Sequence, residues 1–363
     1  MGLLDFRKKK ARAAEQAELE AVKIVEEENT FLEEFSAKEP YRASEGGKTP
    51  SGLYPHEILM LDQAPSFYTD QTAFPKTWRV DVGILDMPRS LASLVDRGFL
   101  TEASIDTTLE GQTVQSLKDA LRKSSLPVGG RKQELINRLK TSLMDTDLDL
   151  YALFPKRRFS LTWDGIRALD EAMYIPYIGR FPVDGLTIWD MHRLITAHPE
   201  TSYRDLIWTH MEQLSAKHHT AQRFTAYRDL RYRMYQFLME EKKLKRAFPF
   251  LAEVMYYDLS GVESTSDPVH RYVSEKYFFP YDNSLVKLSA RNVQAMRKLQ
   301  ADLNLTDEML KALIMQFFSQ FTVPAHLFTK EECFVIILLE LQSDTDRLRQ
   351  LYAFAGKRFA EQY

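Results

Sequence analysis

Residues 113–143 concentrate the side chains of this chain that are best suited to binding a polyanion. The segment reads TVQSLKDALRKSSLPVGGRKQELINRLKTSL, with seven basic residues against Asp119 and Glu134, a net charge of +5 in a chain of net charge −3. Ammonium and guanidinium groups neutralise phosphates, and guanidinium binds them through paired hydrogen bonds. We therefore expect phosphate contacts from Lys118, Arg122, Lys123, Arg131, Lys132, Arg138 and Lys140.

Three side chains of the same segment are candidates for reading bases in a groove: Arg122, Asn137 and Arg138. Phosphate contacts position a protein without specifying a sequence, so we expect no strict base code. A solvated basic surface on a structural hairpin, or a protein-binding surface, has the same composition. Both alternatives stay open at this point.

No group of residues predicts catalysis. The sequence has no P-loop, no G-x-G-x-x-G after an expected strand and no H-E-x-x-H. Cys333 is the single cysteine, and we expect no histidine close to it. His210, His218 and His219 share an expected helical region but lack the further ligand that metal-site spacing requires. We expect no enzyme, no cofactor and no metal site.

Leucine spacing predicts how the basic segment folds. Leu117 and Leu121 lie one helical turn apart, and so do Leu135 and Leu139. Residues 126–130 (LPVGG) cannot continue a helix, because proline lacks a backbone donor and paired glycines allow positive φ. We predict two short helices joined by an extended loop whose leading leucine packs between them.

The segment resembles the SAP motif, a small helix–loop–helix DNA-binding module. The resemblance covers nearly the whole motif but a small part of the chain, and it implies contact with double-stranded DNA and a preference for A·T-rich sites. Modules this short are rarely stable alone, so we expect it to pack on its surroundings. The matching residues are Leu117, Leu126, Pro127, Gly130, Lys132, Leu135, Ile136, Arg138 and Leu139.

Residues 53–178 predict a folded unit that contains the module of residues 113–143. We expect helices over residues 54–61, 88–96 and 164–172 and strands at residues 99–100 and 158–162.

This unit resembles a winged helix-turn-helix. A wing usually needs few residues, so the long separation of the two strands predicts an insertion between them. In this resemblance the 88–96 helix enters the major groove, with Arg89 and Arg97 near phosphates. The matching residues are Gly98, Phe99, Leu100, Phe159, Leu161, Thr162 and Gly165.

Residues 1–35 predict an amphipathic helix, and residues 36–52 (rich in Gly, Pro and Ser) predict a linker. We expect the helix to pack on its own body or to pair with a second copy. An arm on a membrane surface or on nucleic acid is the alternative.

Residues 179–363 predict an all-α domain suited to a protein partner or to self-association. One expected helix pair, within residues 221–259, resembles a single tetratricopeptide-like repeat without a second copy. The other expected helices cover residues 186–197, 202–216, 290–303, 307–321 and 331–353.

Composition shows that most of the chain can build packed cores, since 44% of its 363 residues are hydrophobic and 27% are charged. Most of the expected elements are helices, so we expect a mainly α fold. The longest apolar run, residues 334–339, is far shorter than the ~18 residues of a membrane span. A single cysteine excludes an intrachain disulfide framework and suits the cytoplasm.

The order of these segments resembles a group of bacterial SAP-domain proteins associated with phage or other mobile elements. We expect a non-enzymatic DNA-binding protein whose helical half recruits a protein partner or dimerises. One alternative is an interaction scaffold in which the hairpin is structural. The other is a phage-encoded inhibitor of a host nucleic-acid machine, which the acidic run at residues 26–28 favours.

Overall fold

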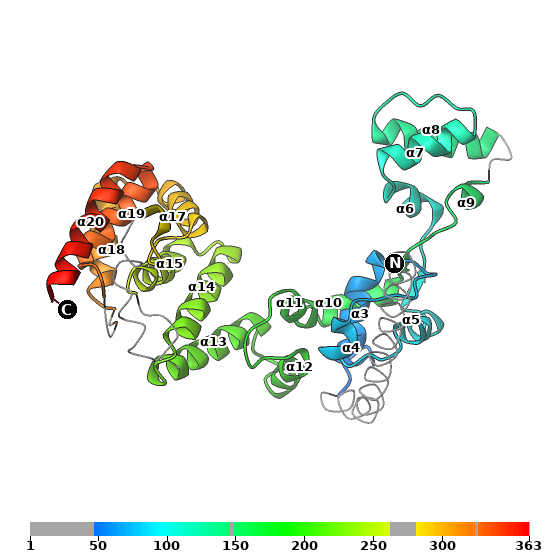
Figure 1. Ribbon diagram of the computed structural model, residues 1–363. Coiled ribbons are helices and arrows are strands. Elements are labelled where there is room, and N and C mark those ends of the chain that lie inside the picture. Colours follow the sequence, from blue (N-terminus) through cyan, green and yellow to red (C-terminus); the bar gives the residue numbers. More distant parts are fainter. Residues whose placement is uncertain (1–46, 146–148, 262–280, 322, 324–325, 363) are drawn as a thin grey trace, which may run out of the picture. The chain divides into compact units, whose positions relative to one another are not determined.

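The computed structural model describes residues 47–145, 149–261, 281–321, 323 and 326–362, and it is mainly α, as the sequence predicts. The described residues fall into two compact units (Figure 1), which we call unit 1 (up to Arg204) and unit 2 (from Asp205). The sequence-based domain boundary at residues 178/179 falls earlier, inside a helix. The expected helix over residues 1–35 and most of the 36–52 linker lie outside the described residues.

Unit 1 begins with four short helical elements. The structure has both helices that the sequence predicts here, over residues 54–61 and 88–96, and the second of them is the third α-helix of the unit. Asp86 caps that helix by accepting a hydrogen bond from the Arg89 backbone N–H at 2.9 Å, and Gly98 follows its end at φ 81°. Its apolar face is buried, because Leu91 and Leu94 are at most 1% exposed. The elements are α3 (Pro55–Gln63), η1 (Ala64–Ser66), α4 (Thr77–Val80) and α5 (Met87–Asp96).

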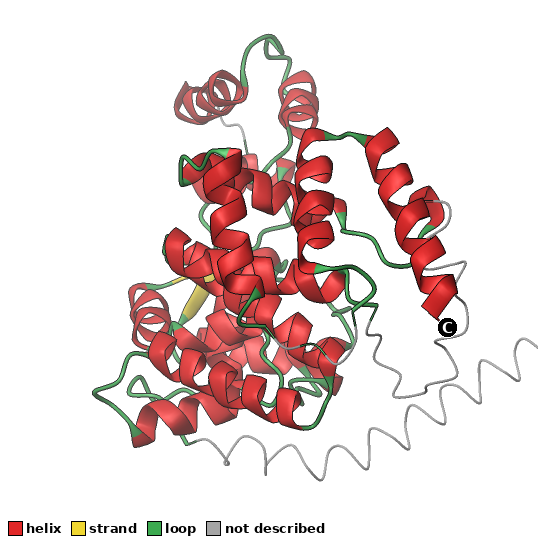
Figure 2. Ribbon diagram, turned by 90° about the vertical axis from the view of Figure 1, so that its left-hand side faces the viewer, coloured by secondary structure: helices red, strands yellow, loops and turns green. Residues whose placement is uncertain are grey.

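Two short strands join parts of unit 1 that are distant in sequence. Strand β1 (Leu100–Glu102) pairs antiparallel with β2 (Phe159–Leu161), with Glu102 opposite Phe159 (yellow in Figure 2). The chain therefore leaves β1 and returns to β2 at the same place, and residues 103–158 form an insertion between paired strands. The winged-helix resemblance of this unit stays a prediction.

The insertion holds four helices, which carry the basic segment. They are α6 (Ile105–Glu110), α7 (Val114–Lys123), α8 (Lys132–Asp145) and α9 (Leu150–Leu153). The predicted helix–loop–helix corresponds to α7 and α8. Helices α10 (Trp163–Glu171), α11 (Tyr174–Arg180) and α12 (Ile188–Ala197) complete unit 1.

Unit 2 is a bundle of helices around one large core, which includes Leu251, Met296 and Ile337, each fully buried. The predicted pair within residues 221–259 is α14 and α15, whereas its likeness to a tetratricopeptide repeat stays a prediction. The elements are α13 (Tyr203–Thr220), α14 (Phe224–Glu240), α15 (Leu244–Asp258), η3 (Tyr281–Asn283), α17 (Ala290–Asp302), α18 (Asp307–Phe318), α19 (Lys330–Gln342) and α20 (Thr345–Gln362).

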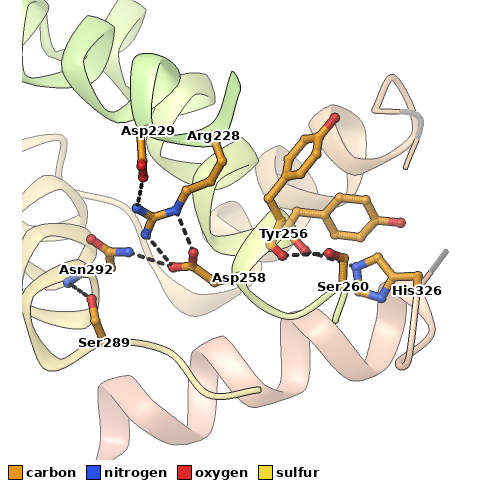
Figure 3. Close-up of polar contacts among 9 residues, drawn as sticks. Arg228, Asp229, Tyr256, Asp258, Ser260, Ser289, Asn292 and His326 are labelled. Atoms are coloured by element: carbon orange, nitrogen blue, oxygen red, sulfur yellow. Dashed lines mark hydrogen bonds and ion pairs between the residues drawn. The ribbon is translucent and has the colours of Figure 1, made fainter. Parts of the chain in front are cut away.

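A polar network ties three helices of unit 2 together. Arg228 of α14 donates to both carboxylate oxygens of Asp258, at 2.7 and 3.0 Å, and Asn292 of α17 donates to the same carboxylate at 2.7 Å (Figure 3). Burial raises the pKa of the Asp258 carboxyl. The network provides hydrogen-bond partners for a largely buried carboxyl group at the end of α15.

The expectation of one helix over residues 331–353 is wrong. Helices α19 and α20 are separate, because Ser343 adopts the left-handed conformation (φ 59°, ψ 33°) and ends α19. The carboxylate of Asp344 then accepts a hydrogen bond from the Arg347 backbone N–H at 3.1 Å, close to the start of α20. Within the described ranges, no helix is both long and apolar enough to cross a membrane.

Candidate nucleic-acid interface

The basic segment is built on a small apolar core. Leu117 and Leu121 of α7 pack with Leu135, Ile136 and Leu139 of α8, and all five are at most 1% exposed. The loop between the helices contributes too, since its partly buried Leu126 and Val128 pack against this core. The predicted placement of Leu126 is confirmed.

Two flanking helices close the same core. Leu109 of α6, Leu150 of α9 and Phe154 after α9 are buried in it. Sequence analysis missed these contributions, because α6 and α9 are too short to show a helical period. Their capping residues were the available signal: Ser104 accepts from the Thr107 backbone N–H, at 3.2 Å, and Asp149 caps α9 in the same way. We call these four helices, with the loop between α7 and α8 and with Phe154, the helix–loop–helix module.

Glycine shapes the entry to α8. Gly130 has φ 122°, a region that residues with a Cβ rarely occupy, and a Cβ there would collide with the Glu134 carboxylate. That carboxylate accepts a hydrogen bond from the Arg131 backbone N–H at 3.1 Å, so it caps the helix. Gly129, by contrast, has open space around a Cβ position.

Three of the seven predicted cations use their donors within the module. The Arg138 guanidinium donates to the carbonyl oxygens of Pro127 and Gly129, at 2.5 and 3.0 Å. Lys132 donates to the Glu110 carbonyl oxygen at 2.7 Å. Lys140 lies 2.8 Å from the Asp106 carboxylate. These side chains join the loop to α8 and α8 to α6.

Arg122 has a partner that is easily exchanged. It forms an ion pair with Asp119, one helical turn earlier, and both side chains are about half exposed. Exposed pairs of this kind contribute about 0.2–1 kcal/mol, because water screens them. A phosphate can therefore replace the Asp119 carboxylate at small cost.

The remaining three cations of the module are free. Among the described residues, the side chains of Lys118, Lys123 and Arg131 form no ion pair or hydrogen bond, and Lys123 and Arg131 are exposed. Lys123 also lines a shallow pocket of about 380 Å³ with residues of α7 and with Leu153 and Phe154. These three side chains, with Arg122, are the ones available to an outside anion.

The two arginines predicted near phosphates at α5 also differ in whether their side chains have partners. Arg89 is exposed, and its side chain has no partner among the described residues. Arg97 forms an ion pair with Glu57, and its guanidinium lies 5.5 Å from the centre of the Phe99 ring. Arg89 is the more available of the two.

A second basic run, Lys156–Arg158, was missed by the sequence analysis although three successive cations were a visible signal. It lies between α9 and β2. Arg157 pairs with Glu102, and its guanidinium lies 4.9 Å from the centre of the Tyr151 ring. Arg158 stacks on Tyr68 at 5.0 Å.

The expectation that Cys333 has no histidine close to it is wrong. His326 Nε2 lies 3.7 Å from the Cys333 Sγ, and it is 3.1 Å from the Tyr256 carbonyl oxygen. Burial raises the pKa of the thiol and lowers the pKa of His326 to about 4, so both groups are neutral near pH 7. The pair is thus not a thiolate–imidazolium pair. Within the described ranges, no three His, Cys, Asp or Glu side chains are placed to share a metal ion.

Comparison with known proteins identifies the module rather than the whole chain. No curated protein matches this chain. Residues 108–144, which run from the end of α6 through α8, match the family model of the SAP domain, and this match supports nucleic-acid binding by that part of the chain.

Proposed function

We propose that this chain is a DNA-binding protein whose helix–loop–helix module binds the phosphates of double-stranded DNA. The observation that carries the proposal is the division of the cations in the module. Arg138, Lys132 and Lys140 hold the module together, whereas Lys118, Lys123 and Arg131 have no partner among the described residues.

Phosphate contact determines the expected behaviour. Each neutralised phosphate releases counterions, so the logarithm of the affinity falls with the logarithm of the salt concentration at about −0.9 per contact. With Arg122 and the three free cations in contact, the slope is about −3.6. Phosphate contact favours no strict sequence, and a preference for A·T-rich DNA is the finer part of the proposal.

The proposal extends to the rest of the chain. Helix α5 supplies a second contact through Arg89, and unit 2 binds a protein partner or a second copy. The proposed function contains no catalytic step and no membrane contact.

The experiment measures binding of the full chain to a dye-labelled DNA duplex at several salt concentrations. The triple variant Lys118→Ala, Lys123→Ala, Arg131→Ala should lower the affinity and reduce the slope by about 2.7, since three phosphate contacts are lost. None of the three side chains has a partner in the part of the chain that the structure describes, so circular dichroism should show an unchanged fold.

A matched variant controls for net charge. Lys245, Lys298 and Lys357 are exposed lysines of unit 2, and changing them to Ala removes the same charge. This control should leave the slope unchanged. Wild-type protein without salt-dependent duplex binding refutes the proposal and favours the scaffold hypothesis, and equal losses in both triple variants refute binding through the module.

A further inference from the structure

The outer face of the small sheet in unit 1 carries a surface that duplex binding by the module does not use. Leu100 is 2% exposed and points inward, so alternation turns Thr101 outward. Ser160 is paired with Thr101 and lies on the same face, and so does Arg158, two residues earlier. Residues opposite one another in a ladder share a face of the sheet.

A third segment extends this face. Tyr68 forms a β-bridge with Arg158, and the Thr69 backbone N–H donates to the Arg157 carbonyl oxygen at 2.9 Å. Tyr68 therefore lies on the outer face, whereas its neighbour Phe67 is buried on the inner one. The Arg158 guanidinium lies 5.0 Å from the centre of the Tyr68 ring, and Tyr68 remains 36% exposed.

A second stack lies at the other end of the face. The Thr162 backbone N–H donates to the Phe99 carbonyl oxygen at 3.2 Å, which extends the ladder by one residue. Phe99, two residues before Thr101, falls on the outer face, and Arg97 stacks on its ring at 5.5 Å. Two arginine–aromatic stacks thus flank the hydroxyls of Thr101 and Ser160.

The charges of this face identify one kind of occupant. Positions 101, 158 and 160 carry one cation, two hydroxyls and no carboxylate, and Lys156 precedes Arg158 by two residues in the chain. Arg97, at the other end of the face, is paired with Glu57. Neither Lys156 nor Arg158 has an acidic partner among the described residues. Aromatic rings and guanidinium planes stack on bases that are unpaired, and flanking cations hold the phosphates between them. Bases inside a duplex are already stacked and cannot use such a surface.

We infer that the outer sheet face, formed by Tyr68, Phe99, Thr101, Arg158 and Ser160, binds single-stranded nucleic acid by stacking unpaired bases on Tyr68. This contact is separate from the phosphate contacts of the module. It gives the chain a second nucleic-acid site, whose ligand is an unpaired strand rather than a duplex.

The test measures binding of the full chain to dye-labelled oligo-dT at fixed salt. Tyr68→Ala should weaken this binding about fivefold or more, because a stacked base is lost. Tyr68→Phe keeps the ring and should bind within about twofold of wild type. Thr101→Glu adds a negative charge to the exposed face without touching the stack, and it should also weaken binding.

The control is Phe354→Ala, which removes the ring of a 65% exposed residue of unit 2 and should leave oligo-dT binding unchanged. Absence of oligo-dT binding by the wild type, or equal binding by wild type, Tyr68→Ala and Thr101→Glu, overturns the inference. Thr101→Glu keeps the test valid if Tyr68→Ala unfolds.

The same experiments distinguish failure of this inference from failure of the proposed function. The triple variant of Lys118, Lys123 and Arg131 should lose duplex affinity and keep oligo-dT affinity. Loss of both places the single strand on the module, which overturns this inference and leaves the proposed function standing. Unchanged duplex affinity in the triple variant refutes the proposed function and leaves the sheet site standing.

Discussion

Arg138 holds the loop of the module through Pro127: its Nη1 donates to the Pro127 carbonyl oxygen at 2.5 Å, and the Gly129 carbonyl oxygen is 3.0 Å away. The loop lies between two helices and has little regular backbone pairing of its own. A cation that the sequence marks as a phosphate contact thus fixes the segment that separates α7 from α8.

Arg138→Ala should therefore loosen the loop. We expect a local loss of about 1–3 kcal/mol, since hydrogen bonds to a charged donor are removed and two carbonyl groups lose their partner. Amide hydrogen exchange of the backbone over residues 126–130 measures the change. Arg131→Ala is the matched control, because its side chain has no partner among the described residues and exchange should stay as in wild type. Equal exchange in both variants would contradict this role for Arg138.

Adjacent glycines of the same loop should respond differently to alanine. Gly130→Ala places a Cβ against the Glu134 carboxylate and requires φ 122°, so we expect a loss of about 1–3 kcal/mol. Gly129→Ala meets open space and should change stability by less than about 0.5 kcal/mol. Hydrogen exchange of α7 and α8 compares the two variants. Similar effects at both positions would show that the loop conformation is not the one described.

Removing the acidic partner of Arg122 should strengthen duplex binding. Asp119→Asn deletes a carboxylate that forms an exposed ion pair with Arg122 and leaves the guanidinium free for phosphate. The pair contributes about 0.2–1 kcal/mol, so affinity should rise up to about fivefold at low salt. Duplex affinity measured at several salt concentrations tests this increase. In the control Asp346→Asn, an exposed carboxylate of unit 2 is removed, and affinity should change less.

His326 should make the stability of unit 2 depend on pH. Burial lowers its pKa from 6.5 to about 4, so the unfolded chain takes up the proton at a higher pH than the folded one. The stability that the neutral imidazole contributes to the folded state is fully present above pH 6.5 and is lost as the pH falls towards 4. The free energy of unfolding falls by up to about 3 kcal/mol, because each unit of pKa shift corresponds to about 1.36 kcal/mol.

The difference between wild type and His326→Gln isolates this effect. An amide can keep the hydrogen bonds to the Tyr256 carbonyl oxygen and the Phe328 backbone N–H, but it does not titrate. Chemical unfolding between pH 4 and 7 should show a steeper fall for wild type. Parallel curves for the two proteins would show that His326 is protonated equally in both states.

Local spacing was enough to predict most helices and the core of the module. Leucines one turn apart fix the facing sides of α7 and α8, and Pro127 with its glycines prevents one continuous helix. These features depend on neighbours within a few residues, which the sequence shows directly. The break between α19 and α20 could not be predicted in this way. It depends on the left-handed conformation of Ser343, which serine rarely adopts.

The sequence by itself determined that this chain has a compact basic helix–loop–helix in a mildly acidic, mainly α protein. Only the tertiary structure decided what each cation does. Arg138, Lys132 and Lys118 are alike in charge, but one meets loop carbonyls, one meets the end of α6 and one meets no partner among the described residues. A side chain's availability depends on which groups the fold brings within hydrogen-bond distance, and those groups come from elsewhere in the chain.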